Sequence, residues 1–267
     1  MYRIILLFCT LLFVQPAPLV QAAGFDHSVW GALLKEHVRV LEDGKASQVD
    51  YAGLAEKREV LSGYLKKMSA VSRDEFDSWA TDEQLAFLLN AYNSWTVELI
   101  LTKYPDLDSI KDLGSLFQSP WKKSFIPLLG EKRSLDDIEH GLIRGSERYN
   151  DPRIHFAANC ASIGCPALRA EPYLGNELQR QLEDATSLFL KDRSRNRLDG
   201  RALKVSSIFK WYREDFKKGW KAIESLEQFF AYYAEDLELT EEQMKQLAKG
   251  KIKIEFLDYD WKLNSIQ

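Results

Sequence analysis

The chain has 267 residues, of which 45% are hydrophobic and 12% aromatic, so it carries enough apolar side chain for a substantial core. Its 36 basic and 40 acidic residues give a formal charge of −4. This balance argues against general nucleic-acid binding, which needs a concentrated basic surface. We expect no nucleic-acid partner and no cofactor. The sequence has no Pro/Ser-rich linker, internal repeat or low-complexity tract, which favours one compact domain.

The first 22 residues resemble a signal peptide. A short basic start, which includes Arg3, precedes an apolar run at residues 4–14. The run has the length of a signal-peptide core and is too short to span a bilayer. We expect cleavage after Ala22, one globular domain over residues 23–267, and no stable membrane insertion after cleavage. The protein would then be periplasmic or secreted; an uncleaved anchor is the alternative.

The first half of the mature chain reads as helices. Apolar spacing predicts helices over residues 25–40 and 54–68, the second loosened near Gly63, and a short helix after Ser72. A capping-box pattern at Thr81 predicts the start of the strongest helix, residues 85–101, which is apolar on all faces and therefore buried. Asn90 and Asn93 share one face of it. Because buried amides need partners, these side chains either tie loops to the helix or point Asn93 into a pocket.

Residues 125–133 read as a hairpin, with Pro127 favouring an edge position. Ser134 then caps a helix whose core stripe leaves His140 on the polar side, one turn before Arg144. A histidine on a polar face is either solvated or lines a site.

The second half mixes helices and short strands. We expect a strand at 154–159, a helix at 177–191, a polar turn at 193–201, a strand at 202–206, aromatic helical segments at 206–216 and 224–234, a helix from Thr240 to Gly250, a strand at 251–257 and an ordered tail at 259–264. The predicted fold class is helix-rich α+β, with a small, mainly antiparallel sheet and one central buried helix.

The segment 150–173 carries most of the reactive side chains. It opens on a turn at Asn150-Asp-Pro152 and holds His155, Cys160 and Cys165, the only cysteines outside the leader. The motifs His155-Phe-Ala-Ala-Asn-Cys160 and Cys165-Pro-Ala-Leu-Arg169 resemble the core of the domain of unknown function 547 family. Three further segments resemble other landmarks of that family, in the expected order: Phe87-Leu-Leu-Asn-Ala-Tyr-Asn93, Ser134-Leu-Asp-Asp-Ile-Glu-His140 and Tyr259-Asp-Trp-Lys-Leu-Asn264. The resemblance covers most of the mature chain and implies no particular activity.

A thiol enzyme is the main functional hypothesis for this segment. A cysteine nucleophile needs a base and a third group that orients the base. His155, His140 and Asn93 or Asp260 are available. In an extended strand, residues of opposite parity face opposite ways, so His155 cannot meet Cys160 unless the chain bends between them. His155 could instead meet Cys165, or Cys160 could face His140. Cys160 is the preferred nucleophile, for hydrolysis or acyl transfer.

Three alternatives remain open. An even number of cysteines in an exported protein also fits a Cys160–Cys165 disulfide in a non-catalytic binding or scaffold domain, stabilised by about 2 kcal/mol for so short a loop. His140, His155, Cys160 and Cys165 could instead hold zinc, although the cysteine spacing is at the edge of the usual range. In the third alternative the cysteines are incidental to a ligand-binding module.

Further polar side chains could hold an unknown small-molecule or peptide ligand. Arg153 and Arg169 could clamp a carboxylate or phosphate, or pair internally with Asp136, Asp137 or Asp260. Asn159, Asp260 and Trp261 complete the predicted substrate-binding set. The last two could equally anchor the C-terminus by packing.

Overall fold

Helix α5 (Thr81–Leu101) is the central element of the computed structural model, which describes residues 24–115 and 117–266. The expected leader at residues 1–22 lies outside these ranges. Most of α5 is buried on every face, as predicted, and it packs against α2, α3, α6 and two short helices. The capping box expected at Thr81 is wrong, because Ala80 is the N-cap and makes no side-chain bond. Gln84, the expected partner, instead donates to the Phe76 and Trp79 carbonyls at 3.0 and 3.2 Å.

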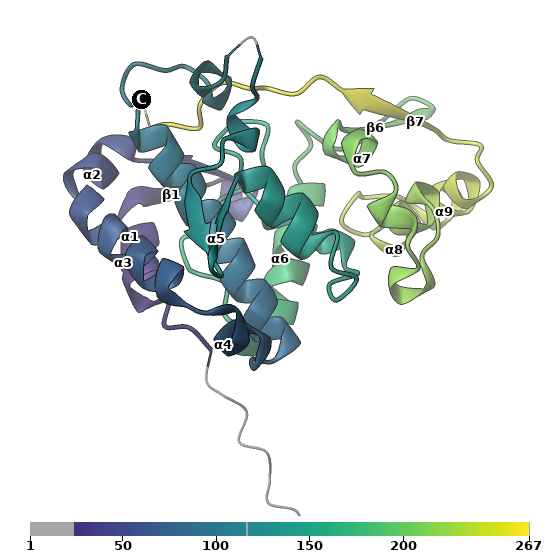
Figure 1. Cartoon of the computed structure of the whole chain (residues 1–267). Helices are drawn as coiled ribbons and strands as arrows, with labels where there is room; N and C mark the ends of the chain where they lie inside the picture. The colour runs from purple at the N-terminus through teal and green to yellow at the C-terminus, as the bar shows by residue number, and fades with distance from the viewer. Residues whose placement is uncertain (1–23, 116, 267) are drawn as a thin grey trace, which may run out of the picture.

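The N-terminal elements surround one side of α5 (Figure 1). They are α1 (Ser28–His37), β1 (Val38–Leu41), η1 (Glu42–Gly44), β2 (Ala46–Val49), α2 (Tyr51–Glu56), α3 (Arg58–Ala70) and α4 (Arg73–Asp77). The first helix ends three residues before the expected end, because the chain turns into the unpredicted β1–β2 hairpin. The second predicted helix is interrupted at Lys57 and not near Gly63. Ser72 caps α4 as expected, accepting a hydrogen bond from Glu75 N at 3.1 Å.

The hairpin predicted at 125–133 is confirmed as β3 (Ile126–Leu128) and β4 (Glu131–Arg133). Its two turn residues, Leu129 and Gly130, both have positive φ, as a two-residue hairpin turn requires. Two short helices, η2 (Ile110–Leu113) and η3 (Pro120–Lys122), precede it. A π-helical turn, η4 (Asp137–Ile143), follows it, and Ser134 and Asp137 exchange side-chain-to-backbone hydrogen bonds at its start.

The strand predicted at 154–159 is wrong. Residues 152–156 form a short 3₁₀ helix, η5 (Pro152–Phe156). Asp151 caps it by accepting from Arg153 N at 2.9 Å, and Pro152 occupies the first helical position. Both features favour a helix start, and they outweigh the short apolar run that suggested a strand.

The C-terminal elements form the other side of the molecule (Figure 1). They are η6 (Gly175–Glu177), α6 (Leu178–Leu190), β5 (Arg197–Asp199), β6 (Ala202–Ser206), α7 (Ile208–Trp211), η7 (Asp215–Lys217), η8 (Trp220–Ala222), α8 (Leu226–Tyr232), α9 (Glu241–Ala248) and β7 (Lys253–Leu257). The strands predicted at 202–206 and 251–257 are confirmed, whereas β5 falls in the segment predicted as a turn. In this sheet β6 pairs antiparallel with β5 and parallel with β7.

Two hydrophobic cores lie side by side. The larger surrounds α1–α5, and the smaller is built from α6–α9 and β6 with an aromatic cluster around Phe209. In Figure 1 the chain after β7 returns from the second core across the top to the first. Bridges from Leu263 to Ser162 and from Ser265 to Val49 fix this tail, which is ordered as expected. The helix-rich α+β class is confirmed.

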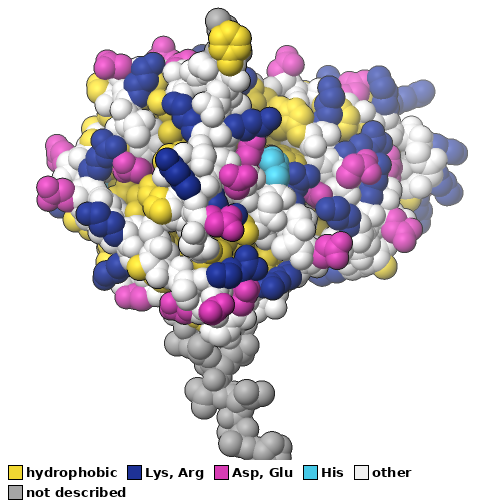
Figure 2. All heavy atoms as spheres, in the orientation of Figure 1, with side chains coloured by type: hydrophobic (Ala, Val, Ile, Leu, Met, Phe, Trp, Pro, Cys, Tyr) yellow, Lys and Arg dark blue, Asp and Glu magenta, His cyan; other side chains and the backbone are white. Residues whose placement is uncertain are grey.

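Figure 2 shows basic and acidic side chains interspersed over one face, without a dominant patch of either sign. None of the helices in the described ranges is long and apolar enough to cross a membrane.

Candidate functional site

A cleft of about 180 Å³ lies where the two cores meet. It brings together five residues predicted from the sequence: His140, His155, Cys160, Cys165 and Trp261. Polar and aromatic side chains that were not predicted as site residues complete the wall: Tyr92, Ser119, Trp121, Asp136, Glu139, Trp211, Tyr212 and Tyr259.

Residues 159–166, here called the cysteine loop, are held by the side chain of Asn93 on α5. Its Nδ2 donates to the Ala157 carbonyl at 3.0 Å, and its Oδ1 accepts from Asn159 N at 2.8 Å. Asn159 in turn donates to the Pro166 carbonyl at 2.8 Å, which closes the loop on itself. Asn93 and Asn159 are therefore placed to position the loop, and neither lines the cleft.

The C-terminal tail holds the outer side of the cysteine loop. Ile163 N and Gly164 N donate to the carbonyls of Lys262 and Asp260, both at 2.8 Å. A Cβ at Gly164 would lie only 2.9 Å from the ring of Tyr259, so the close approach of loop and tail requires glycine.

The sulfur atoms of Cys160 and Cys165 lie at disulfide bonding distance, with their Cα atoms 6.1 Å apart. Cys160 is half-buried and Cys165 only 3% exposed. The Tyr259 hydroxyl lies 3.2 Å from each sulfur, and Ser162 Oγ lies 3.3 Å from Cys160 Sγ. Within the cleft, Cys160 is therefore the more accessible of the two.

The imidazole of His155 is fixed by Asp215, which lies sixty residues further along the chain. His155 Nε2 lies 2.8 Å from Asp215 Oδ2, and the ring stacks on Tyr212 with centroids 3.9 Å apart. Asp215 is itself buried and also accepts from Arg144 Nε and from Lys218 Nζ at 2.8 Å. The Asp215 carboxylate thus accepts hydrogen bonds from His155 and from two cationic side chains, Arg144 and Lys218.

The surroundings set the charge of this pair. Burial lowers the pKa of His155, and the hydrogen bond to Asp215 only partly offsets this. Burial opposes ionisation of Asp215, but donation from His155, Arg144 and Lys218 outweighs it and holds the pKa of the carboxyl well below its ordinary value. Asp215 is therefore ionised and can only accept, so His155 donates to it from Nε2, and burial favours the neutral form of the imidazole. In that form the lone pair of His155 is on Nδ1.

Helix η4 supplies the acidic wall of the cleft. Glu139 is 7% exposed and Asp136 is half-buried. Burial raises the pKa of Asp136, which His140 partly opposes. Burial also raises the pKa of the Tyr92 and Tyr212 hydroxyls, and the adjacent Glu139 carboxylate raises both further.

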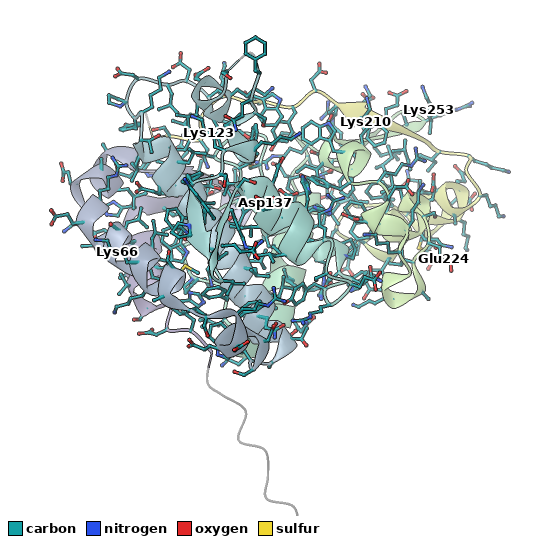
Figure 3. The ribbon with its side chains drawn as sticks, viewed as in Figure 1. Lys66, Lys123, Asp137, Lys210, Glu224 and Lys253 are labelled. Atoms are coloured by element: carbon teal, nitrogen blue, oxygen red, sulfur yellow. A yellow bond between two sulfur atoms is a disulfide. The ribbon has the colours of Figure 1, made fainter. Side chains whose placement is uncertain are left out.

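Figure 3 places Asp137, at the start of η4, between Lys66 on one side of the molecule and Glu224 on the other, close to where the two cores meet.

His140 lies at the rim of this wall. Its side chain is 43% exposed, and its Nδ1 lies 2.5 Å from Arg144 Nη1. Because a guanidinium only donates, Nδ1 must accept and carries no proton. His140 is therefore both partly solvated and part of the site.

Besides Asn159, three further predicted ligand-binding residues lie outside the cleft. Arg153 is buried and pairs with Asp151 at 2.6 Å and Glu183 at 2.9 Å. Arg169 pairs with Glu171. Both arginines thus form internal pairs, though not with the acids predicted. Asp260 is exposed, and its Oδ1 accepts from Lys262 N at 2.9 Å.

The geometry does not support a zinc site. Within residues 24–115 and 117–266, no group of three or more His, Cys, Asp and Glu side chains is arranged to hold a metal. The two sulfurs that would be ligands face each other instead.

The unpredicted site residues differ in how visible they are in the sequence. Tyr92, Glu139 and Tyr259 each lie within one of the family landmarks, so the convergence of those motifs was the available signal. Asp215 lies in a charged stretch, Arg213-Glu-Asp-Phe216, that resembles an exposed helix surface. Nothing local marks it as the partner of His155.

Comparison with known proteins agrees with the landmarks between residues 87 and 169, whereas the landmark at 259–264 lies outside the matched range. The family model described as "Protein of unknown function, DUF547" matches residues 76–190, which span α5, the cysteine loop and α6. No curated protein and no solved structure gives a significant match. Over these residues, which make up less than half of the chain, the sequence is similar to the DUF547 family.

Proposed function

We propose that the cleft is the active site of a Cys/His-dependent hydrolase or acyl transferase. The observation that supports this most strongly is the 2.8 Å hydrogen bond between His155 Nε2 and Asp215, in the same cleft as the half-buried Cys160. A nucleophile, a base and a group that orients the base are the three parts such chemistry needs. In this proposal they are Cys160, His155 and Asp215.

The catalytic form requires reduction of the sulfur pair. A dithiol reductant would supply two electrons and two protons, leaving thiols at Cys160 and Cys165 and becoming a disulfide itself. His155 Nδ1 then takes the Cys160 proton, and the thiolate attacks the carbonyl carbon of an ester or amide. The leaving group departs with the proton from His155. Water or an acceptor nucleophile then releases the acyl group and regenerates the thiol.

The experiment compares thiol reactivity in four proteins: wild type, Cys160→Ser, His155→Gln and His37→Gln. His37 is the matched control, because it is a buried histidine 3.2 Å from Asp50 and does not line the cleft. Each full-length protein is reduced, desalted and treated with iodoacetamide at several pH values, and the labelled cysteine is mapped by mass spectrometry. Hydrolysis of p-nitrophenyl acetate is measured in parallel.

We expect wild type and His37→Gln to be labelled at Cys160 at neutral pH and to hydrolyse the ester only when reduced. A general base contributes about 10²–10⁴-fold, so His155→Gln should lose at least about tenfold in both rates. The hypothesis fails if Cys160 in the wild type titrates like a free thiol, near pH 8.5, and His155→Gln changes nothing.

The disulfide distance favours a second function, a non-catalytic binding domain stapled by Cys160 and Cys165. In that case the reduced protein has no esterase activity above Cys160→Ser, and reduction only loosens the cysteine loop. The same four-protein experiment distinguishes the two functions.

We also propose that the chain is exported, with residues 1–22 as the leader. A cysteine pair at bonding distance suits an oxidising compartment. Cells expressing the full chain are fractionated, and the N-terminus of the product is read by mass spectrometry. A periplasmic or secreted product starting at Ala23 supports the proposal, and a cytoplasmic product that retains residues 1–22 contradicts it.

A further inference from the structure

The cleft has an uneven charge. Its lining includes two carboxylates, from Asp136 and Glu139, and two imidazoles, from His140 and His155, but no lysine or arginine among the described residues. Of the imidazoles, burial favours the neutral form of His155. The lining side chains therefore include acids but no lysine or arginine, although Arg144 and Lys111 contact His140 and Trp261 from outside the lining.

Glu139 is the buried part of the acidic wall, and its charge lacks a cationic partner. The side chain is 9% exposed, and within the described residues no lysine or arginine lies within 4.0 Å of it. The nearest basic group is His140 Nδ1 at 3.8 Å, and that nitrogen is already accepting from Arg144. A buried carboxylate is unfavourable unless a cation or several donors compensate it, and the Tyr92 and Tyr212 hydroxyls that hydrogen-bond Glu139 add no positive charge. The cleft thus contains a charge that a ligand could balance.

The remaining wall consists of aromatic faces. The rings of Trp211 and Trp261 stack with centroids 5.6 Å apart, and Tyr259 lies 4.5 Å from Trp261. Trp211 is 46% exposed, which leaves apolar surface accessible. Aromatic faces attract cations, and Lys111 Nζ already lies 3.8 Å from the ring centroid of Trp261.

We infer that the cleft binds a ligand with an alkylammonium group, whose charge lies toward Glu139 and whose carbon substituents pack on the aromatic rings. This deepens the proposed function and rests on it, because it makes the ammonium group part of the substrate. The volume of about 180 Å³ is below the roughly 300–1,000 Å³ usual for whole small-molecule sites. The cleft would thus hold one small group or the end of a longer molecule.

Neutral sugars also stack on tryptophan, but they leave the Glu139 charge unbalanced. The two ligand classes predict different responses to charge. A cation site should discriminate between ligands of one shape that differ only in charge, whereas a sugar site should bind a neutral ring without needing a cation.

The test measures binding of choline and of 3,3-dimethylbutan-1-ol, its neutral isostere, by NMR titration of the full-length protein in its oxidised form. Glu139→Gln is compared with Glu147→Gln, which removes the same charge from an exposed residue just beyond η4. We expect choline to bind at least about tenfold more tightly than the isostere, because aromatic faces in a desolvated site favour a cation by more than that factor. Glu139→Gln should remove most of that preference, and Glu147→Gln should leave it within about twofold.

Equal binding of choline and its isostere overturns the inference, as does binding of N-acetylglucosamine with no binding of choline. The wild-type comparison decides the matter even if Glu139→Gln does not fold. Because the oxidised protein has no free thiol, the result is independent of catalysis. Choline selectivity without esterase activity in the reduced protein would reject the enzyme and keep the ligand class. Esterase activity without choline selectivity would reject the alkylammonium ligand and support the enzyme.

Discussion

Replacing Asn93 with alanine tests how α5 builds the site. The side chain is 3% exposed, and its two hydrogen bonds satisfy the carbonyl of Ala157 and the N–H of Asn159. Alanine would leave both backbone groups buried without a partner. Each such group costs about 1–3 kcal/mol. Allowing for partial relaxation, we expect Asn93→Ala to lower the free energy of unfolding by about 3 kcal/mol.

Asn90→Ala is the matched control. Asn90 lies on the same face of α5 and makes the same pair of bonds to Tyr173, donating to its carbonyl at 2.7 Å and accepting from its N–H at 3.0 Å. The two variants should lose similar stability in urea unfolding, with the midpoint changing and the slope unchanged. Only Asn93→Ala, however, releases the cysteine loop.

The distinguishing assay is the rate at which a phosphine reductant opens the sulfur pair under native conditions. Each decrease of about 1.4 kcal/mol in the free energy of local opening raises the population of the open form about tenfold. Asn93→Ala should therefore be reduced at least about tenfold faster than wild type, and Asn90→Ala within about threefold. Equal acceleration in both variants, or a stability loss below about 1 kcal/mol in Asn93→Ala, would refute the positioning role.

Two further predictions concern stability. Burial lowers the pKa of His27 to about 4 from 6.5, so the unfolded chain takes up a proton below pH 6.5 that the folded protein accepts only near pH 4. Stability should therefore fall across this window by about 3 kcal/mol, at 1.36 kcal/mol per unit. Denaturant titrations at several pH values should show a flatter profile for His27→Gln; an unchanged profile would contradict the assignment. Arg153→Met should cost about 3 kcal/mol because it leaves the largely buried carboxylate of Asp151, 13% exposed, without its cation, whereas Arg169→Met, whose partner Glu171 is 49% exposed, should cost under about 1 kcal/mol. Equal losses in urea unfolding would refute this difference.

The spacing of apolar residues predicted the helices and strands in which that spacing is regular along the whole element. Helix α5 was recognisable because a helix with apolar residues on all sides must be buried in the interior of a domain. The strand β7 was recognisable from its alternation. The same approach failed at residues 154–159, where an apolar run of strand length lies in a 3₁₀ helix. There, the Asp151 cap and Pro152 determine the backbone conformation.

That error affected the prediction of the site. The objection to pairing His155 with Cys160 assumed an extended strand between them, and the helical turn of η5 removes that assumption. The partner that fixes His155 could not be foreseen, because Asp215 reaches it through tertiary packing of the second core against the first. Motif positions locate such a cleft better than local chemistry does, since Glu139 and Tyr259 lie in family landmarks although neither was predicted as a site residue.

The redox state of the cysteines separates two properties of the cleft. With the sulfurs bonded, Cys160 has no proton to give, and His155 Nδ1 has no thiol to activate. The carboxylate of Glu139 lies on η4 and the ring of Trp211 on α7, outside the cysteine loop, whereas Trp261 lies on the tail that hydrogen-bonds to that loop. Ligand binding should persist when the pair is oxidised, and only turnover should require reduction. A ligand that bound only the reduced protein would show that the cysteine loop shapes the pocket as well as supplying its nucleophile.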